Sequence, residues 1–91
     1  MEEKTPYKID KNYLIRTVTM IYTGKLIAEY EKELVITEAC WIPETERWME
    51  TCATGDFKEV EPYPKKAEVI ISKGAILDMF VVDWNLPDKQ K

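Results

Sequence analysis

The stretch YLIRTVTMIYTGKLIAEYEKELVITEACWI, from Tyr13 to Ile42, decides the fold of this chain. β-branched and other apolar residues dominate it, and such residues pack well on a pleated strand surface. Polar or flexible residues interrupt it mainly at Gly24 and at Glu31-Lys32. The stretch therefore predicts a nearly continuous series of antiparallel strands, and it places the chain among small β folds.

The hairpin within this stretch is its clearest part. Alternation from Lys25 to Tyr30 predicts a strand with two distinct faces. Glu31-Lys32-Glu33 is a polar tip, and residues 34–42 return antiparallel. The return strand begins apolar on both faces, which predicts cover on both sides, by a core and by a helix or another subunit.

Two local points stay open at the start of the stretch. The first strand either turns near Met20-Ile21 or continues to Tyr22. Gly24 is either part of a turn or the site of a sharp bend within a strand, as small barrels use to curve their sheets.

The segment from Pro43 to Gly55 predicts the one helix. Pro43 suits a first helical turn, the acidic Glu44 and Glu46 favour the positive end of the helix dipole, and Gly55 suits a helix end. One apolar face results from the spacing of four residues, Trp48, Met49, Cys52 and Ala53. A helix this short needs packing against the sheet.

The rest of the chain predicts three more extended segments. Residues 56–64 form an edge strand or an extended connector that two prolines end, residues 68–72 form a short buried strand, and residues 75–84 form the last strand after Gly74. We therefore predict a mainly β fold, a small bent barrel of five to six antiparallel strands with one short helical insert at about residues 43–54; the resemblance given below implies the SH3-like or Sm-like type. Residues 1–91 form a single domain, with flexible tails at 1–11 and 86–91.

Composition limits the partners. The chain has 91 residues, 13 Lys and Arg, 17 Asp and Glu, and a net charge of −4. It carries no long apolar run and no apolar export signal, so we expect a cytoplasmic protein that does not enter a membrane. The negative charge argues against nucleic-acid binding, which needs a basic surface. Candidate contacts for such binding are Lys65, Lys66 and Lys73, and further lysines in the tails are Lys4, Lys8, Lys11, Lys89 and Lys91.

The available chemistry predicts no enzyme, no cofactor and no metal. Without histidine the chain lacks the commonest general base and any Ser-His or Cys-His nucleophile pair. Cys40 and Cys52 are expected as reduced thiols, and two sulfurs alone do not complete a zinc site. Neighbouring carboxylates are expected by chance in so acidic a chain, namely Glu29 with Glu31, Glu44 with Glu46, Glu59 with Glu61, and Asp78 with Asp83. No glycine-rich phosphate-binding loop is present.

Two groups of side chains have alternative roles. Asp78 and Asp83 lie within an apolar segment, and they either face outward or are buried and paired, with Arg16 as a candidate partner. Trp41, Trp48 and Trp84 either pack between the helix and the sheet or form a platform on which bases stack. For both groups the structural role is the expected one.

Five segments carry a resemblance that covers most of the chain, namely Arg16-Thr17-Val18-Thr19, Thr23-Gly24-Lys25, Glu38-Ala39-Cys40-Trp41-Ile42, Glu59-Val60-Glu61-Pro62-Tyr63 and Lys73-Gly74-Ala75-Ile76. Through these segments the chain resembles a family of small proteins of unknown function encoded by phages and prophages. It implies a phage or prophage origin and transfers no site residues.

A weaker similarity is to Sm-like barrels. Gly24 to Ala28 followed by Leu34-Val35-Ile36 is similar to their second and third strands, and Ser72 to Ile76 is similar to a basic-Gly step late in that fold. The tip at Glu31-Lys32 lacks the Asp and Asn that such proteins place around RNA bases. The resemblance thus implies a barrel more than RNA binding.

The strands that are apolar on both faces favour a protein that assembles. More apolar surface is present than one small core and one short helix cover, and exposed strand edges invite partners. We therefore expect a non-enzymatic assembly or interaction module, a homo-oligomer or a binder of another protein. The alternative is a nucleic-acid-binding Sm-like barrel.

Overall fold

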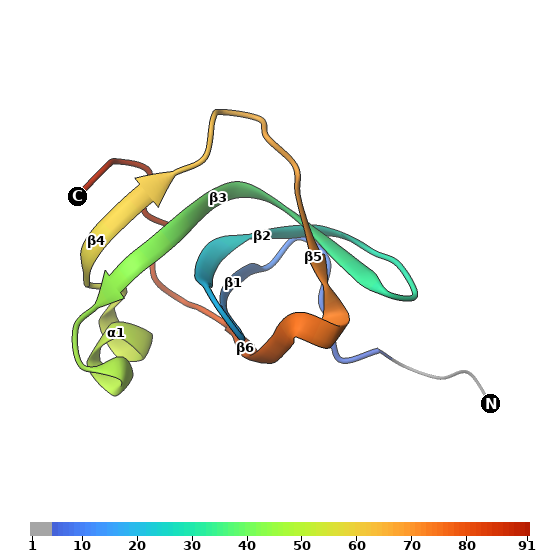
Figure 1. Cartoon of the computed structure of the whole chain (residues 1–91), viewed down its shortest axis with the longest axis horizontal. Helices are drawn as coiled ribbons and strands as arrows, with labels where there is room; N and C mark the ends of the chain where they lie inside the picture. The colour runs from blue at the N-terminus through green and yellow to red at the C-terminus, as the bar shows by residue number, and fades with distance from the viewer. Residues whose placement is uncertain (1–4) are drawn as a thin grey trace.

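A single antiparallel sheet of six strands organises the chain in the computed structural model, which describes residues 5–91 (Figure 1). The elements are β1 (Asn12–Thr17), β2 (Ile21–Glu29), β3 (Glu33–Thr45), α1 (Trp48–Thr54), β4 (Phe57–Pro62), β5 (Val69–Ser72), the 3-10 turn η1 (Lys73–Ala75) and β6 (Ile76–Val81). The prediction of a mainly β fold with one short helix is confirmed. The extended segment at residues 56–64, for which a strand and a connector were both open, contains strand β4.

The long strand β3 organises the sheet. Its first part, residues 33–36, pairs with β5, and its second part, residues 40–45, pairs with β4 on the same side. Its other side pairs with β2, and the order continues through β1 to β6. Figure 1 shows β3 crossing the molecule with β4 near one end and β5 near the other. Within residues 5–91 no ladder joins β5 to β6, so the pairing does not close a barrel.

The structure shows where the first strand ends and what Gly24 does, the two points that the sequence left open. β1 ends at Thr17, whose hydroxyl donates to the carbonyl of Met20 at 2.8 Å and accepts from its N–H at 2.9 Å, so the chain turns before β2 begins. Gly24 lies inside β2, where the register with β3 shifts. A Cβ on Gly24 would lie 2.8 Å from Cδ1 of Ile36, so the glycine permits close approach within a bent strand.

The predicted start of the helix is wrong, and its predicted end is confirmed. Pro43 belongs to β3, and α1 begins five residues later at Trp48. The β3–β4 register shifts between Trp41 and Glu44, and such an irregularity accepts a proline that donates no hydrogen bond. Gly55 caps the helix in the left-handed conformation, with φ of 76°. The last strand is also shorter than predicted and ends at Val81.

Two apolar clusters lie in this fold. The first contains Tyr13, Ile15, Leu26, Leu34, Ile36, Ala39 and Ile71. The second contains Leu14, Cys40, Ile42, Phe57, Val60 and Val82, with Trp48, Cys52, Trp84 and Leu86 packed against it. Consecutive residues of β1 enter different clusters because strand side chains alternate in direction. Apolar residues on both faces of the strands are therefore partly buried within the chain itself.

The segments predicted to be flexible tails contact the sheet where they are described. Residues 1–4, including Lys4, lie outside the described residues. The Asp10 N–H donates to the Leu26 carbonyl at 2.7 Å. At the other end, the backbone of Lys91 exchanges two hydrogen bonds of 3.0 Å with Val60 of β4.

Candidate interaction surface

The three lysines proposed as nucleic-acid contacts lie in two different settings. Lys65 and Lys66 are exposed in the turn after β4 and line an open groove of about 740 Å³. Lys73 lies in η1 and is not among the groove residues. Its ammonium is 2.8 Å from a Glu29 carboxylate oxygen and 5.1 Å from the centre of the Tyr7 ring. Lys73 is thus already paired.

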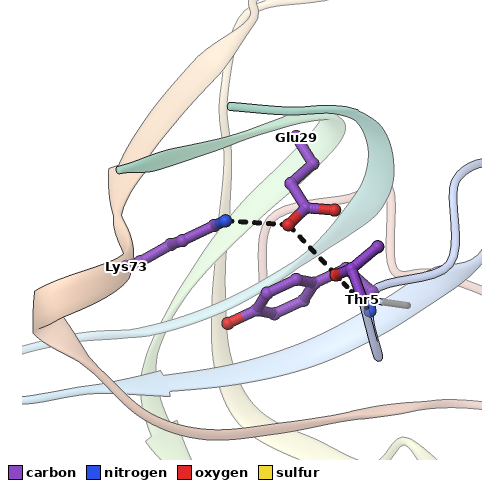
Figure 2. Close-up of polar contacts among 4 residues, drawn as sticks. Thr5, Glu29 and Lys73 are labelled. Carbon is purple, nitrogen blue, oxygen red and sulfur yellow. Dashed lines mark hydrogen bonds and ion pairs between the residues drawn. The ribbon is translucent and has the colours of Figure 1, made fainter. Parts of the chain in front are cut away.

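Glu29 is the centre of a polar cluster that links three segments. Lys73 and the hydroxyl of Thr5, which donates at 3.0 Å, meet at the same carboxylate oxygen (Figure 2). The hydrogen bond from Lys73 holds the pKa of Glu29 below its ordinary value, and the bond from Thr5 acts in the same direction. The cluster joins the end of β2 to η1 and the N-terminal segment, which is a structural task.

The groove beside Lys65 and Lys66 carries mixed charge. Its charged lining residues are three lysines and three acids, Lys25, Lys65, Lys66, Asp10, Glu38 and Asp88. Three of these, Asp10, Glu38 and Lys66, have positive φ, which is uncommon outside glycine. Because the acids offset the lysines, the groove lacks the concentrated positive potential that phosphate binding requires.

The acid in the last strand has the partner expected from the sequence. Asp78 and Arg16 are opposite each other in β6 and β1, and they form a two-pronged ion pair with distances of 3.0 and 2.7 Å. The guanidinium lies 5.2 Å from the Trp48 ring. The hydrogen bonds that Arg16 donates to Asp78 raise the pKa of Arg16. Both Asp78 and Asp83 are exposed, so the outward-facing alternative is confirmed.

The described side chains show no arrangement for metal or thiol chemistry. Across residues 5–91 no group of three His, Cys, Asp or Glu residues forms a candidate metal cluster. Cys40 and Cys52 are both free thiols, and burial raises the pKa of each. The Cys40 thiol donates to the carbonyl of Pro87 at 3.1 Å, so it is held beneath the C-terminal segment.

The tryptophans do not form the single cluster that the sequence suggested. Trp48 and Trp84 pack against the second apolar cluster, and the Trp84 indole N–H donates to the Cys52 carbonyl at 2.9 Å. Trp41 is absent from that cluster, and it lies opposite Tyr22 on the neighbouring strand. The reason is alternation, since the two residues flanking Trp41 enter the clusters and Trp41 points the other way.

Exposed apolar side chains gather on the two strands at either end of η1. Leu77 is 60% exposed, Phe80 38% and Val81 41% on β6, and Ile70 is 69% exposed on β5. On the adjacent helix Met49 is 75% exposed. The sequence signal for this surface was the apolarity of both faces of these strands.

A shallow depression of about 330 Å³ continues this surface onto the helix. It is lined by Trp48, Met49, Cys52, Asp78, Met79 and Phe80. Its residues come from α1 and β6, which are separated along the chain by β4 and β5, so sequence reasoning missed it. We call the exposed residues Met49, Leu77, Phe80 and Val81 the β6 surface.

Comparisons with known proteins add no further assignment to this surface. In the part of the chain that the structure describes, no helix is long and apolar enough to span a membrane. Neither a protein-family model, nor a curated protein, nor a solved structure matches this chain.

Proposed function

We propose that this chain is a non-enzymatic interaction module that assembles with copies of itself or with another protein through its exposed strand edges. The observation that supports this most is the concentration of exposed apolar side chains on β5 and β6, each of which pairs with only one other strand in residues 5–91. Unpaired strand edges and contiguous apolar patches are features of interaction surfaces.

The chemistry of the side chains fits a binding role better than catalysis. The sequence has no histidine, and the two ion pairs found among residues 5–91 join β1 to β6 and β2 to η1. The two thiols have raised pKa values, which disfavours the reactive thiolate.

A small barrel of SH3-like or Sm-like type is the finer fold that we propose. β5 pairs with β3, β6 pairs with β1, and η1 alone separates the two strands along the chain, so the sheet curves as in a small barrel whose β5 and β6 edges stay unpaired in residues 5–91. The phage or prophage origin rests on the sequence resemblance alone, and the cytoplasmic location stays a prediction.

Light scattering on the purified protein tests the assembly proposal. We expect a dimer or a larger homo-oligomer at tens of micromolar, because the exposed apolar surface is costly in water. The proposal would be contradicted if the protein is a monomer and no other protein co-purifies with it from cells.

Nucleic-acid binding is the second candidate, supported by the lysines that share one groove, Lys25, Lys65 and Lys66. Binding of single-stranded DNA or RNA at low salt that weakens on adding salt would favour it, since the electrostatic contribution is greatest there. Loss of that binding in a Lys65→Ala/Lys66→Ala variant, with Lys89→Ala as the control, would assign it to the groove.

A further inference from the structure

We propose that β6 pairs with β6 of a second copy of this chain, forming a two-fold symmetric dimer whose sheet continues across the interface. The inference rests on the proposed assembly function and names the partner and the strand. It specifies an antiparallel register in which Met79 lies opposite Met79 of the other copy and Leu77 lies opposite Val81.

The backbone of β6 has free hydrogen-bonding groups on its outer edge. The Val82 N–H donates to the Asn12 carbonyl at 2.9 Å, so Val82 faces β1. Backbone groups alternate in direction along an antiparallel strand. Phe80 and Asp78 therefore also face β1, and Met79 and Val81 present their N–H and C=O groups outward. In residues 5–91, β1 is the only strand that pairs with β6.

This edge has one of the features by which proteins protect free edges, a register shift that leaves Leu77 out of the ladder with β1, but it has no lysine or proline. Lysine, proline and inward-pointing charge are the usual protection. β6 carries only Asp78 as a charged residue, and its own chain supplies the counterion Arg16. The outer side of β4, by contrast, is paired with Lys91 and ends at Pro62. β5 has four residues, and Glu68 and Lys73 flank it.

The charge of Asp78 disfavours one neighbouring register of the β6 pair. Shifting the two-fold axis so that Asp78 lies opposite Asp78 would oppose like charges, which is destabilising. In the proposed register Asp78 lies opposite Phe80 of the other copy, and Leu77 lies opposite Val81. The pairs other than Asp78 with Phe80 are apolar throughout, so β6 is complementary to itself.

Exposed apolar side chains flank the edge of β6 on both faces of the sheet. Phe80 lies with Met49 on the side that carries α1, and Leu77 and Val81 lie on the opposite side, because side chains alternate along a strand. A stable dimer buries about 800 Å² per partner, so the strand edge and both flanking faces would contribute to the interface. The two-fold axis is perpendicular to the sheet, so α1 of both copies lies on one side, and Met49 and Phe80 of the two copies converge there.

Sedimentation velocity of the full chain over a concentration series tests the pairing. We expect a dimer for the unmodified protein and at least a tenfold weaker dimer for Val81→Lys and for Leu77→Lys. Ile70→Lys is the matched control, because Ile70 is an apolar residue at least as exposed as Leu77 and Val81 but lies on β5. It should leave the dimer unchanged, and circular dichroism should show the same fold for all four proteins.

Amide hydrogen exchange provides a second readout that needs no substitution. The Met79 and Val81 amides should exchange slowly at high protein concentration and quickly at low concentration, whereas the Phe80 amide should be protected in both. An oligomer that Ile70→Lys disrupts and Val81→Lys does not, or one larger than a dimer, overturns the β6 pairing and leaves the assembly function standing. A protein that is monomeric at every concentration overturns this pairing, and if it also has no protein partner, the assembly function fails with it.

Discussion

Thr23 and Thr51 are both fully buried, and their hydroxyl groups differ in hydrogen bonding. The Thr51 hydroxyl donates to the Asp56 carbonyl at 2.8 Å and accepts from the Glu46 N–H at 3.0 Å. Within residues 5–91 the Thr23 hydroxyl has no well-formed hydrogen bond, and the polar group that interacts with it is the Cys40 thiol opposite it on β3, a weak hydrogen-bonding partner. A buried hydroxyl without a partner is destabilising because it has lost its hydrogen bonds to water.

Replacing each threonine by valine, which has nearly the same shape, measures how much each hydroxyl group contributes to stability. We expect Thr23→Val to leave the free energy of unfolding unchanged or to raise it by about 1 kcal/mol, because the poorly paired hydroxyl is removed. Thr51→Val should lower it by about 2 kcal/mol, because two backbone groups lose their partner. Urea unfolding measures both. A loss of stability in Thr23→Val equal to that in Thr51→Val would show that the Thr23 hydroxyl is paired in solution.

Gly55 is a position where the sequence predicted the local structure but not its tertiary reason. The left-handed φ was expected of a glycine after a helix. The structure adds that a Cβ here would lie 2.5 Å from Cδ2 of Trp84, so the indole packs directly on the glycine. Trp84 is 29 positions away along the chain, and nothing in the local pattern indicates this contact.

At the scale of elements, the ion pair between Lys73 and Glu29 connects η1 to the end of β2. The pKa of Glu29 is lowered in the folded state, so the folded protein binds this proton less tightly than the unfolded chain does. The resulting stabilisation is complete above the unfolded pKa, and it is lost as pH falls through the lowered, folded pKa. The pair therefore contributes to resistance to acid.

In Glu29→Gln the free energy of unfolding should fall less steeply as the pH decreases below 4.5, the ordinary pKa of glutamate. Urea midpoints between neutral pH and pH about 3 measure this slope, which follows the difference in bound protons between the two states. Glu31→Gln is the control, because Glu31 is exposed in the adjacent hairpin tip and its side chain forms no ion pair with any of residues 5–91. Equal slopes for the two variants would mean that the Lys73 contact is not maintained in solution.

Pairing between elements shows where sequence reasoning about this fold succeeded and where it did not. Alternation predicted β2 and β3, and the proline and glycine positions predicted a helix near the correct place. Pro43 was assigned to the helix because its fixed φ suits a first helical turn as well as an irregular strand. Only the register shift between β3 and β4 distinguishes the two, and register depends on a partner strand.

For the whole molecule, the C-terminal segment acts as a cover over the second apolar cluster. Leu86 packs against this cluster, and the Pro87 carbonyl accepts the hydrogen bond from the Cys40 thiol. The backbone of Lys91 pairs with β4. Cys40 is therefore a probe of whether this segment opens separately from the rest of the fold.

Leu86→Ala should increase the rate at which a thiol reagent labels Cys40 by about tenfold or more, if the loss of packing favours local opening of the segment. The measurement uses a Cys52→Ser background, so that one thiol remains. Asp83→Ala is the control, since Asp83 is exposed and precedes the packed segment. If labelling instead changes only in proportion to global stability, the segment opens together with the sheet.

The sequence by itself determined the strand-rich character of Tyr13 to Ile42, the hairpin near Glu31-Lys32, the end of the helix at Gly55 and the lack of histidine chemistry. These follow from side-chain alternation, backbone preference and composition, which act over a few residues. Only the tertiary structure decided that β3 has two partners on one side, that Lys73 is paired with Glu29, and that α1 and β6 share one exposed apolar surface. Those features join residues far apart in the chain, so they depend on strand register and on the packing of the two apolar clusters.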